Sequence, residues 1–203
     1  MPYTGGSQKR ARAILWRKRM LYAGIAALVV IAWAIYTYNR FVTLGRRAGE
    51  AWSGISVQLK RRRDLIPNLA DVVKGYAAHE KGLFSEVAAA RAALGTIPAD
   101  VPTPELAASE NRVTGLAGKL VAVSEAYPDL KADTAFLKLQ AALFETEDQL
   151  QMARRYYNGT VRNYMILYES FPSLLLPKLF PFARREYFQL ENDADRAAPQ
   201  VIL

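Results

Sequence analysis

The sequence predicts an all-α protein in which an N-terminal transmembrane helix precedes an elongated antiparallel bundle of three to four helices. Three observations predict this class. Residues 20–39 form an uncharged apolar segment, and beyond it apolar residues recur at steps of three and four, the period of amphipathic helices. No stretch shows the alternation typical of a strand. The chain therefore divides into a basic tail at 1–19, a transmembrane helix at 20–39 and a helical-bundle domain at 40–203.

The distribution of charge argues against nucleic acid as a partner. The formal net charge is +8, but the first 39 residues carry six cations and no acid. The rest of the chain is close to neutral, with 21 cations and 19 acids. Cations beside an apolar segment attract anionic lipid head groups and set the direction of insertion. The expected partner of the tail is therefore the lipid bilayer.

The segment 20–39 has the length of a membrane span, because 20 residues at helical rise cover about 30 Å. A buried core helix is disfavoured because apolar residues cover every face of the segment. A cleaved signal peptide is the stronger alternative, since Ala32-Trp33-Ala34 has the spacing of a cleavage site. The bulky Trp33 and the apolar run that follows it favour a retained single-pass anchor.

Charge near the two ends of the segment predicts its orientation. Six cations precede it, and three follow within ten residues, namely Arg40, Arg46 and Arg47. The positive-inside rule then places the N-terminus in the cytoplasm and the bundle outside it. The basic run 60–63 lies just beyond the usual counting window and favours the reverse orientation.

The first amphipathic stripe of the bundle domain runs from Phe41 to Leu94 and contains one proline. Pro67 has no backbone N–H, so the helix hydrogen bond to the carbonyl of Arg63 is missing. The apolar stripe nevertheless continues in register beyond it. Pro67 is therefore expected to mark a kink or a hinge rather than the end of a helix. The proline-rich residues 95–104 predict a loop.

Two further helices are predicted from their start signals. Thr103 is a candidate N-cap for a helix that has Pro104 in its first turn and ends near Pro128. Asp133 is a candidate N-cap for a third helix, whose apolar stripe continues to Phe171. A short last helix is expected near 184–197. The aromatic residues of these stripes are interpreted as core, namely Trp52, Tyr76, Tyr157, Tyr164, Tyr168 and Phe171.

A family resemblance rests on the strings AW at 51–52, VQLKRR at 57–62, DLIPNL at 64–69, VKGY at 73–76, EN at 110–111, AYPDLKA at 126–132, ARRYYN at 153–158, FPS at 171–173, KLF at 178–180 and EYF at 186–188. With these strings, residues 39–80 closely resemble the signature region of the LemA family, and the resemblance extends over essentially residues 39–200. It implies an N-terminal membrane helix, a helical-bundle domain and a bacterial inner-membrane location. It implies no activity, since the family has no accepted catalytic residues. Two departures are the long basic tail and Arg63, which stands where an aromatic residue is common.

The sequence offers no recognisable catalytic, cofactor-binding or metal-binding residues, and a non-enzymatic protein is expected. There is no cysteine, and His79 is the single histidine, which is interpreted as a solvated helix residue. No phosphate loop or nucleophile elbow is present. Glu145, Glu147 and Asp148 could contribute to a carboxylate site, but a solvated acidic face is the preferred interpretation.

The run Lys60, Arg61, Arg62, Arg63 and Asp64 is the candidate interaction patch. One interpretation is a docking surface for an acidic partner or anionic lipid. The other is a structural ion network, because Arg62 falls within the buried stripe and needs a carboxylate from a neighbouring helix. Both interpretations remain open at the level of the sequence.

Function is less defined than fold. The leading hypothesis is a membrane-tethered interaction or scaffold module that binds a protein partner or further copies of itself. Ala23 and Ala27 have a spacing that suits packing between membrane helices. The alternative is a membrane-surface organiser that binds anionic lipid through 1–19, 60–63 and 171–182, and an enzyme with a carboxylate site is least favoured. The apolar segment 171–182 suits docking on the bundle, a membrane surface or a partner.

Overall fold

The computed structural model describes the backbone of residues 5–96 and 102–188, and the side chains of 16–93 and 102–188. Within these ranges the chain is helical and contains no strand, which confirms the all-α class. The elements are α1 (Gly5–Tyr76), α2 (Lys81–Thr96), α3 (Pro104–Ser124), α4 (Pro128–Ala132), α5 (Thr134–Glu169), a 3-10 turn η1 (Ser173–Leu175) and α6 (Leu176–Leu179).

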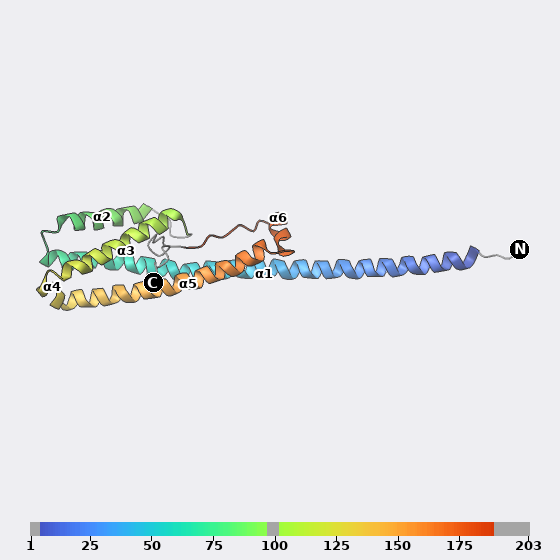
Figure 1. Cartoon of the computed structure of the whole chain (residues 1–203), viewed down its shortest axis with the longest axis horizontal. Helices are drawn as coiled ribbons and strands as arrows, with labels where there is room; N and C mark the ends of the chain where they lie inside the picture. Colours follow the sequence, from blue (N-terminus) through green and yellow to red (C-terminus); the bar gives the residue numbers. More distant parts are fainter. Residues whose placement is uncertain (1–4, 97–101, 189–203) are drawn as a thin grey trace, which may run out of the picture.

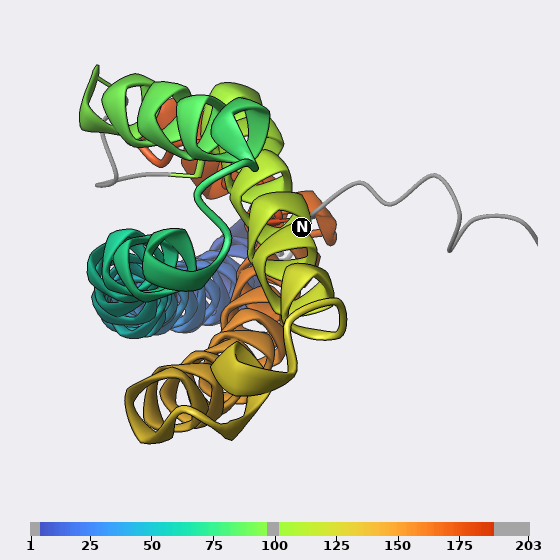
Figure 2. The same ribbon diagram turned by 90° about the vertical axis from the view of Figure 1, so that its left-hand side faces the viewer.

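The molecule is a long rod with a bundle at one end (Figure 1). Helix α1 runs its full length, and α5 returns antiparallel along the C-terminal half of α1, forming the most extensive interface in the fold. Helices α2 and α3 lie against each other and cover the far end of α1, as the end-on view in Figure 2 also shows. The elongated helical bundle after an apolar N-terminal helix is thus confirmed.

Most of the apolar segment of α1 is not covered by the bundle, which contacts this segment only from Trp33 onward. Large apolar side chains on all of its faces are exposed, with Met20 69%, Leu28 68% and Tyr36 66% accessible. A core helix of a soluble protein would bury these residues, so that alternative does not hold. The helix is long and apolar enough to cross a membrane. The structure therefore agrees with a membrane-associated protein.

The stripe from Phe41 to Leu94 forms two helices, which corrects the prediction of one. Helix α1 passes through Pro67 without ending and stops at Tyr76, and the turn 77–80 leads into α2. His79 lies exposed in this turn rather than on a helix. The turn allows Val87 and Ala90 of α2 to fold back into the core, where both are buried. Burial of this apolar face accounts for the reversal of the chain.

The predicted helix starts are confirmed at atomic detail. The Thr103 hydroxyl accepts a hydrogen bond from the Leu106 amide at 3.1 Å, and Pro104 occupies the first turn of α3. The Asp133 carboxylate accepts one from the Phe136 amide at 2.8 Å at the start of α5. Each cap satisfies an amide that the helix itself leaves without a partner. Of the predicted loop 95–104, residues 97–101 lie outside the described residues.

The C-terminal segment differs from expectation. Residues 184–188 are extended rather than helical, and the remainder of the predicted helix 184–197 lies outside the described residues. Side chains of α5 hold this extended strap: Tyr157 donates to the Glu186 carbonyl at 2.9 Å, and Asn158 bonds both main-chain groups of Phe188. These bonds replace those that a helix would provide.

Two of the aromatic residues interpreted as core are exposed. Trp52, Tyr157 and Tyr164 are buried and Tyr168 is partly buried, as expected. Tyr76 is 43% exposed because it ends α1 and directs its hydroxyl to Asp133 at 2.8 Å. Phe171 is 79% exposed because α5 ends at Glu169, before the stripe reaches it.

The core consists of two apolar clusters along the axis of the bundle. The cluster nearer the apolar half of α1 ends at Leu59, Leu106 and Leu150. The far cluster begins at Ile66 on α1, with Val113 and Leu143 as its nearest members on α3 and α5. Both clusters use the same three helices, and charged side chains occupy the level between them.

Candidate functional site

The basic run fans around α1, so its members meet different surroundings. Successive residues of a helix are turned by about 100°, and four of them in a row cannot all face solvent. Lys60 and Arg61 are exposed, Arg63 is partly buried, and Arg62 is completely buried. Asp64, the last member of the candidate patch, is exposed.

Arg62 reaches from α1 to both neighbouring long helices. Its guanidinium donates to the Glu110 carboxylate and, at 3.1 Å, to the Glu110 main-chain carbonyl on α3. It also donates to Glu147 of α5 and to the Thr114 hydroxyl, each at 2.8 Å. The expected pairing of Arg62 with carboxylates of neighbouring helices is therefore present. A buried guanidinium held by several acceptors is the geometry that offsets the cost of removing its charge from water.

The flanking cations extend this network toward the surface. Arg63 donates to the second Glu110 carboxylate oxygen at 3.0 Å, so Glu110 bridges two arginines. Arg61 pairs with Glu145 at 3.1 Å, and both side chains are about half exposed. Among the described residues, Lys60 makes no ion pair. The run thus supplies two cations to an internal network and two to the surface.

Arg154 of α5 is partly buried next to this network. Burial, and then the positive charge of Arg62, lower the pKa of Arg154 to about 10, while Glu147 and Glu110 act in the opposite direction. Arg154 remains charged at neutral pH, since this value lies well above 7. Its guanidinium also lies 5.9 Å from the centre of the Phe188 ring. Two arginines, Arg62 and Arg63, and two carboxylates, Glu110 and Glu147, therefore form the network, and Arg154 lies at its edge.

This level is a charged layer between two apolar clusters. Arg62 lies between Leu59 and Ile66, and Glu110 lies between Leu106 and Val113, so each occupies a stripe position that is otherwise apolar. Any longitudinal slip of α3 or α5 against α1 would separate the charges and bury them unpaired. We interpret the layer as the device that fixes the register of the helices. Sequence reasoning missed Glu110, although a charge within its apolar stripe was the available signal.

The acidic residues of α5 do not gather into a common site. Glu145 pairs with Arg61 at the surface, and Glu147 pairs with Arg62 in the interior. Asp148 is exposed. Within the part of the chain that the structure describes, no three His, Asp or Glu side chains are grouped so that they could hold a metal ion.

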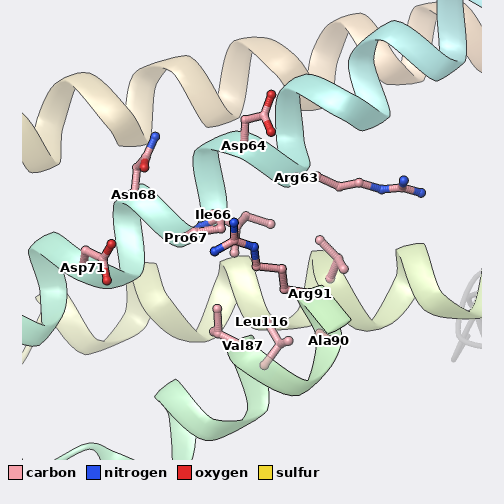
Figure 3. A pocket seen from close by; sticks show the side chains of 11 residues that line it. Arg63, Asp64, Ile66, Pro67, Asn68, Asp71, Val87, Ala90, Arg91 and Leu116 are labelled. Carbon is pink, nitrogen blue, oxygen red and sulfur yellow. The ribbon is translucent and has the colours of Figure 1, made fainter. Parts of the chain in front are cut away.

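A groove opens beside the charged layer, where α1, α2 and α3 meet. Its volume is about 490 Å³, and Pro67 is one of its lining residues. Pro67 has no amide hydrogen to donate to the Arg63 carbonyl. Figure 3 shows Asp64, Asn68 and Asp71 along its α1 edge and Arg91 across it on α2. Its floor is apolar and comprises Ile66, Val87, Ala90, Val113 and Leu116. An apolar floor between charges of both signs suits a peptide or a protein surface.

Comparison with known proteins places the chain in a family. The sequence model described as the LemA family matches residues 51–202. Protein LemA of Metamycoplasma hominis is 28% identical over 168 residues, covering 77% of this chain and 72% of that protein. Magnetosome protein MamQ 2 of Paramagnetospirillum magneticum is 25% identical over 199 residues, covering 87% and 73%. Magnetosome protein MamQ of Magnetospirillum gryphiswaldense is 24% identical over 208 residues, covering 90% and 76%. The matched region contains the charged layer, the groove and most of the bundle, and the chain belongs to the LemA family.

Proposed function

We propose that the protein is a membrane-anchored, non-enzymatic scaffold that binds a protein partner at the groove beside Pro67. The observation that carries this proposal is the continuity of α1, which forms the exposed apolar half, the charged layer and one wall of the groove. A single helix that is packed against α5 holds the groove at a fixed place relative to the anchor. This arrangement is expected of a scaffold that holds a binding site at a fixed distance from the membrane.

The height of the groove above the bilayer favours a protein as its partner. With the span at 20–39, Pro67 lies 28 residues farther along α1, which corresponds to about 40 Å. Lys60 and Arg61 lie about 30 Å from the same boundary. Electrostatic attraction to lipid head groups decays within about 8–10 Å at physiological salt. The exposed cations of the patch are therefore too far from their own membrane to bind it, which argues against the lipid-organiser alternative for residues 60–63.

Charge and shape at the groove suit a partner that carries both signs. Asp64 and Asp71 make no ion pair among the described residues, nor does Arg91 on the opposite wall. Unpaired surface charges around an apolar floor provide orientation, while the floor provides binding energy. We infer that a partner segment with apolar side chains and flanking charges occupies the groove.

Photo-crosslinking in cells that express the full chain tests this proposal. A photoreactive amino acid is placed at one of three exposed groove residues, Asp64, Asn68 or Arg91, and at Phe144 as a matched control that is 56% exposed on α5. Adducts with one other protein from the three test positions, and none from Phe144, are expected. Adducts only with further copies of the chain would indicate a self-assembling scaffold. Equal adducts from all four positions, or none, would contradict a docking site at the groove.

A further inference from the structure

We propose that residues 171–180 form a second membrane contact, which enters the interfacial layer of the bilayer beside the point where α1 leaves it. The inference rests on the proposed anchor at 20–39. Residues 171–180 lie apart from the groove and close the bundle at the anchor end.

The bundle begins before the apolar segment of α1 ends. Trp33, six residues inside the proposed span, packs against the core of the bundle, and Thr37 is only 4% exposed. The Tyr38 ring lies 5.1 Å from the Phe180 ring and 5.3 Å from the Phe182 ring. Figure 1 shows α6 beside α1 where the uncovered stretch of that helix starts. The loop after α5 and the last turns of the span therefore lie at the same depth.

The side chains that this loop exposes are those that a bilayer interface accepts. Phe171 is 79% exposed and Leu179 78%, and Leu175 and Phe180 are each more than 40% exposed. Ile166, on the last turns of α5, is 57% exposed at the same end of the bundle. The single charge within 171–182 is Lys178, whose long side chain can reach the head groups while its stem stays in the apolar layer.

The loop is held in place by its inner side. Leu176 and Ser173 are buried, and the single hydroxyl proton of Ser173 is shared between the Leu167 and Ser170 carbonyls, at Oγ–O distances of 2.6 and 2.8 Å. Phe182 stacks on Phe41 of α1 with ring centres 4.7 Å apart. The exposed apolar residues are therefore presented on a structured loop whose opposite side is docked. Charges follow at once along the chain, where Arg184 pairs with Glu169 at 2.7 Å and both side chains are exposed.

Depth decides between lipid and protein as the occupant of this surface. A soluble partner would have to meet Phe171 and Leu179 at the level of Tyr38, where the membrane surface already lies. A loop with apolar tips at that level buries them by entering the boundary between head groups and acyl chains, about 5–10 Å deep. The occupant of this surface is the bilayer that surrounds the anchor.

The test uses the full chain in vesicles of phosphatidylcholine and phosphatidylglycerol. Because the chain has no cysteine, single spin labels can be attached at Leu179→Cys, Met152→Cys and Val29→Cys. Met152 is the matched control, because it is 48% exposed on the middle of α5, away from the anchor end of the bundle. Val29 reports on the anchor itself. Collision rates of each label with oxygen, which concentrates in lipid, and with a water-soluble nickel chelate are compared.

The label at 179 is expected to collide mainly with oxygen, as at 29, whereas the label at 152 collides mainly with the nickel chelate. Nickel-dominated collisions at 179 with oxygen-dominated collisions at 29 would overturn the second contact and leave the anchor standing. Nickel-dominated collisions at 29 would instead remove the anchor on which the proposed function depends. A label at 179 shielded from both reagents would show that protein covers the loop, and spin dilution with unlabelled chain would then reveal whether a second copy does so.

Discussion

Arg62 occupies a stripe position of α1 whose neighbours in the stripe are apolar and buried. Removing a guanidinium from water costs several kcal/mol, and good geometry with two carboxylates returns about that amount. The pairing itself is therefore a weak source of net stability. Its effect is selective, because an alternative helix register would keep the cost and lose the partners. We interpret Arg62 as a determinant of which bundle forms.

Loss of Glu110 is expected to be costly, since it pairs with Arg62 and Arg63 at once. Glu110→Ala leaves the buried Arg62 with Glu147 as its remaining carboxylate, and we expect the free energy of unfolding to fall by about 3–5 kcal/mol. Glu145→Ala removes the exposed partner of Arg61 and should cost less than about 1 kcal/mol. Urea unfolding measures both. Similar small losses for the two variants would show that the layer does not constrain the fold.

At the scale of elements, one hydrogen bond joins the end of α1 to the start of α5. The Tyr76 hydroxyl donates to Asp133 at 2.8 Å. The bond raises the pKa of Tyr76 above 10.0. The Phe136 amide and then Tyr76 lower the pKa of Asp133 below 3.8. The stabilisation from Asp133 is fully present above pH 3.8 and is lost as the pH falls through the lowered pKa of Asp133. The stabilisation from Tyr76 is fully present below pH 10.0 and is lost as the pH rises through the raised pKa of Tyr76.

The stability difference between the wild type and Tyr76→Phe should therefore be largest between about pH 3.8 and 10.0 and should shrink on both sides. Thermal unfolding at pH values below, within and above this window measures it. Tyr156→Phe is the matched control, because Tyr156 is also exposed and forms no hydrogen bond among the described residues. A difference that stays constant across the range would mean that the Tyr76–Asp133 bond is not formed in solution.

Pro67 is expected to be a static feature rather than a hinge. Helix α5 packs against α1 on both sides of it, at Leu150 in one cluster and at Leu143 in the other, without a break of its own. Spin labels at Val57→Cys and Lys74→Cys lie on either side of Pro67 and are 17 residues apart, about 25 Å along the helix. We expect a narrow distance distribution whose width does not change in a Pro67→Ala background. A broad distribution that narrows with alanine would identify a hinge.

Local signals predicted the starts of the helices, and long-range packing decided what the sequence left open. Thr103 and Asp133 were identifiable because a cap acts within three residues. The turn at 77–80 contains no proline and exists because α2 packs back on α3, so the continuous stripe concealed it. The extended strap depends on Tyr157 and Asn158, which lie about 30 residues away in the chain. The buried role of Arg62 followed from helical spacing, whereas its partners required the register of three helices.

At the scale of the whole molecule, the distribution of charge predicts the orientation of the bundle. The positive-inside rule predicts the tail in the cytoplasm and the bundle outside it. In cells expressing the full chain, a membrane-impermeant thiol reagent should label His79→Cys, at the exposed turn after α1, without permeabilisation. It should label Ser7→Cys only after permeabilisation. The opposite pattern would show that the basic run at 60–63 outweighs the tail.

Because α1 is one continuous helix, the rotation of the anchor about its axis sets the direction in which the groove faces. Each residue inserted into its uncovered stretch would rotate everything beyond it by about 100° and advance it by about 1.5 Å. If a second membrane helix packs against the anchor at Ala23 and Ala27, the groove has a fixed orientation about the α1 axis relative to that helix. One alanine inserted after Val29 would turn the groove away from its partner, and about seven would bring it nearly back. Binding of the partner at the membrane should then depend on the angle by which the inserted residues rotate the groove, and not on the number of residues inserted.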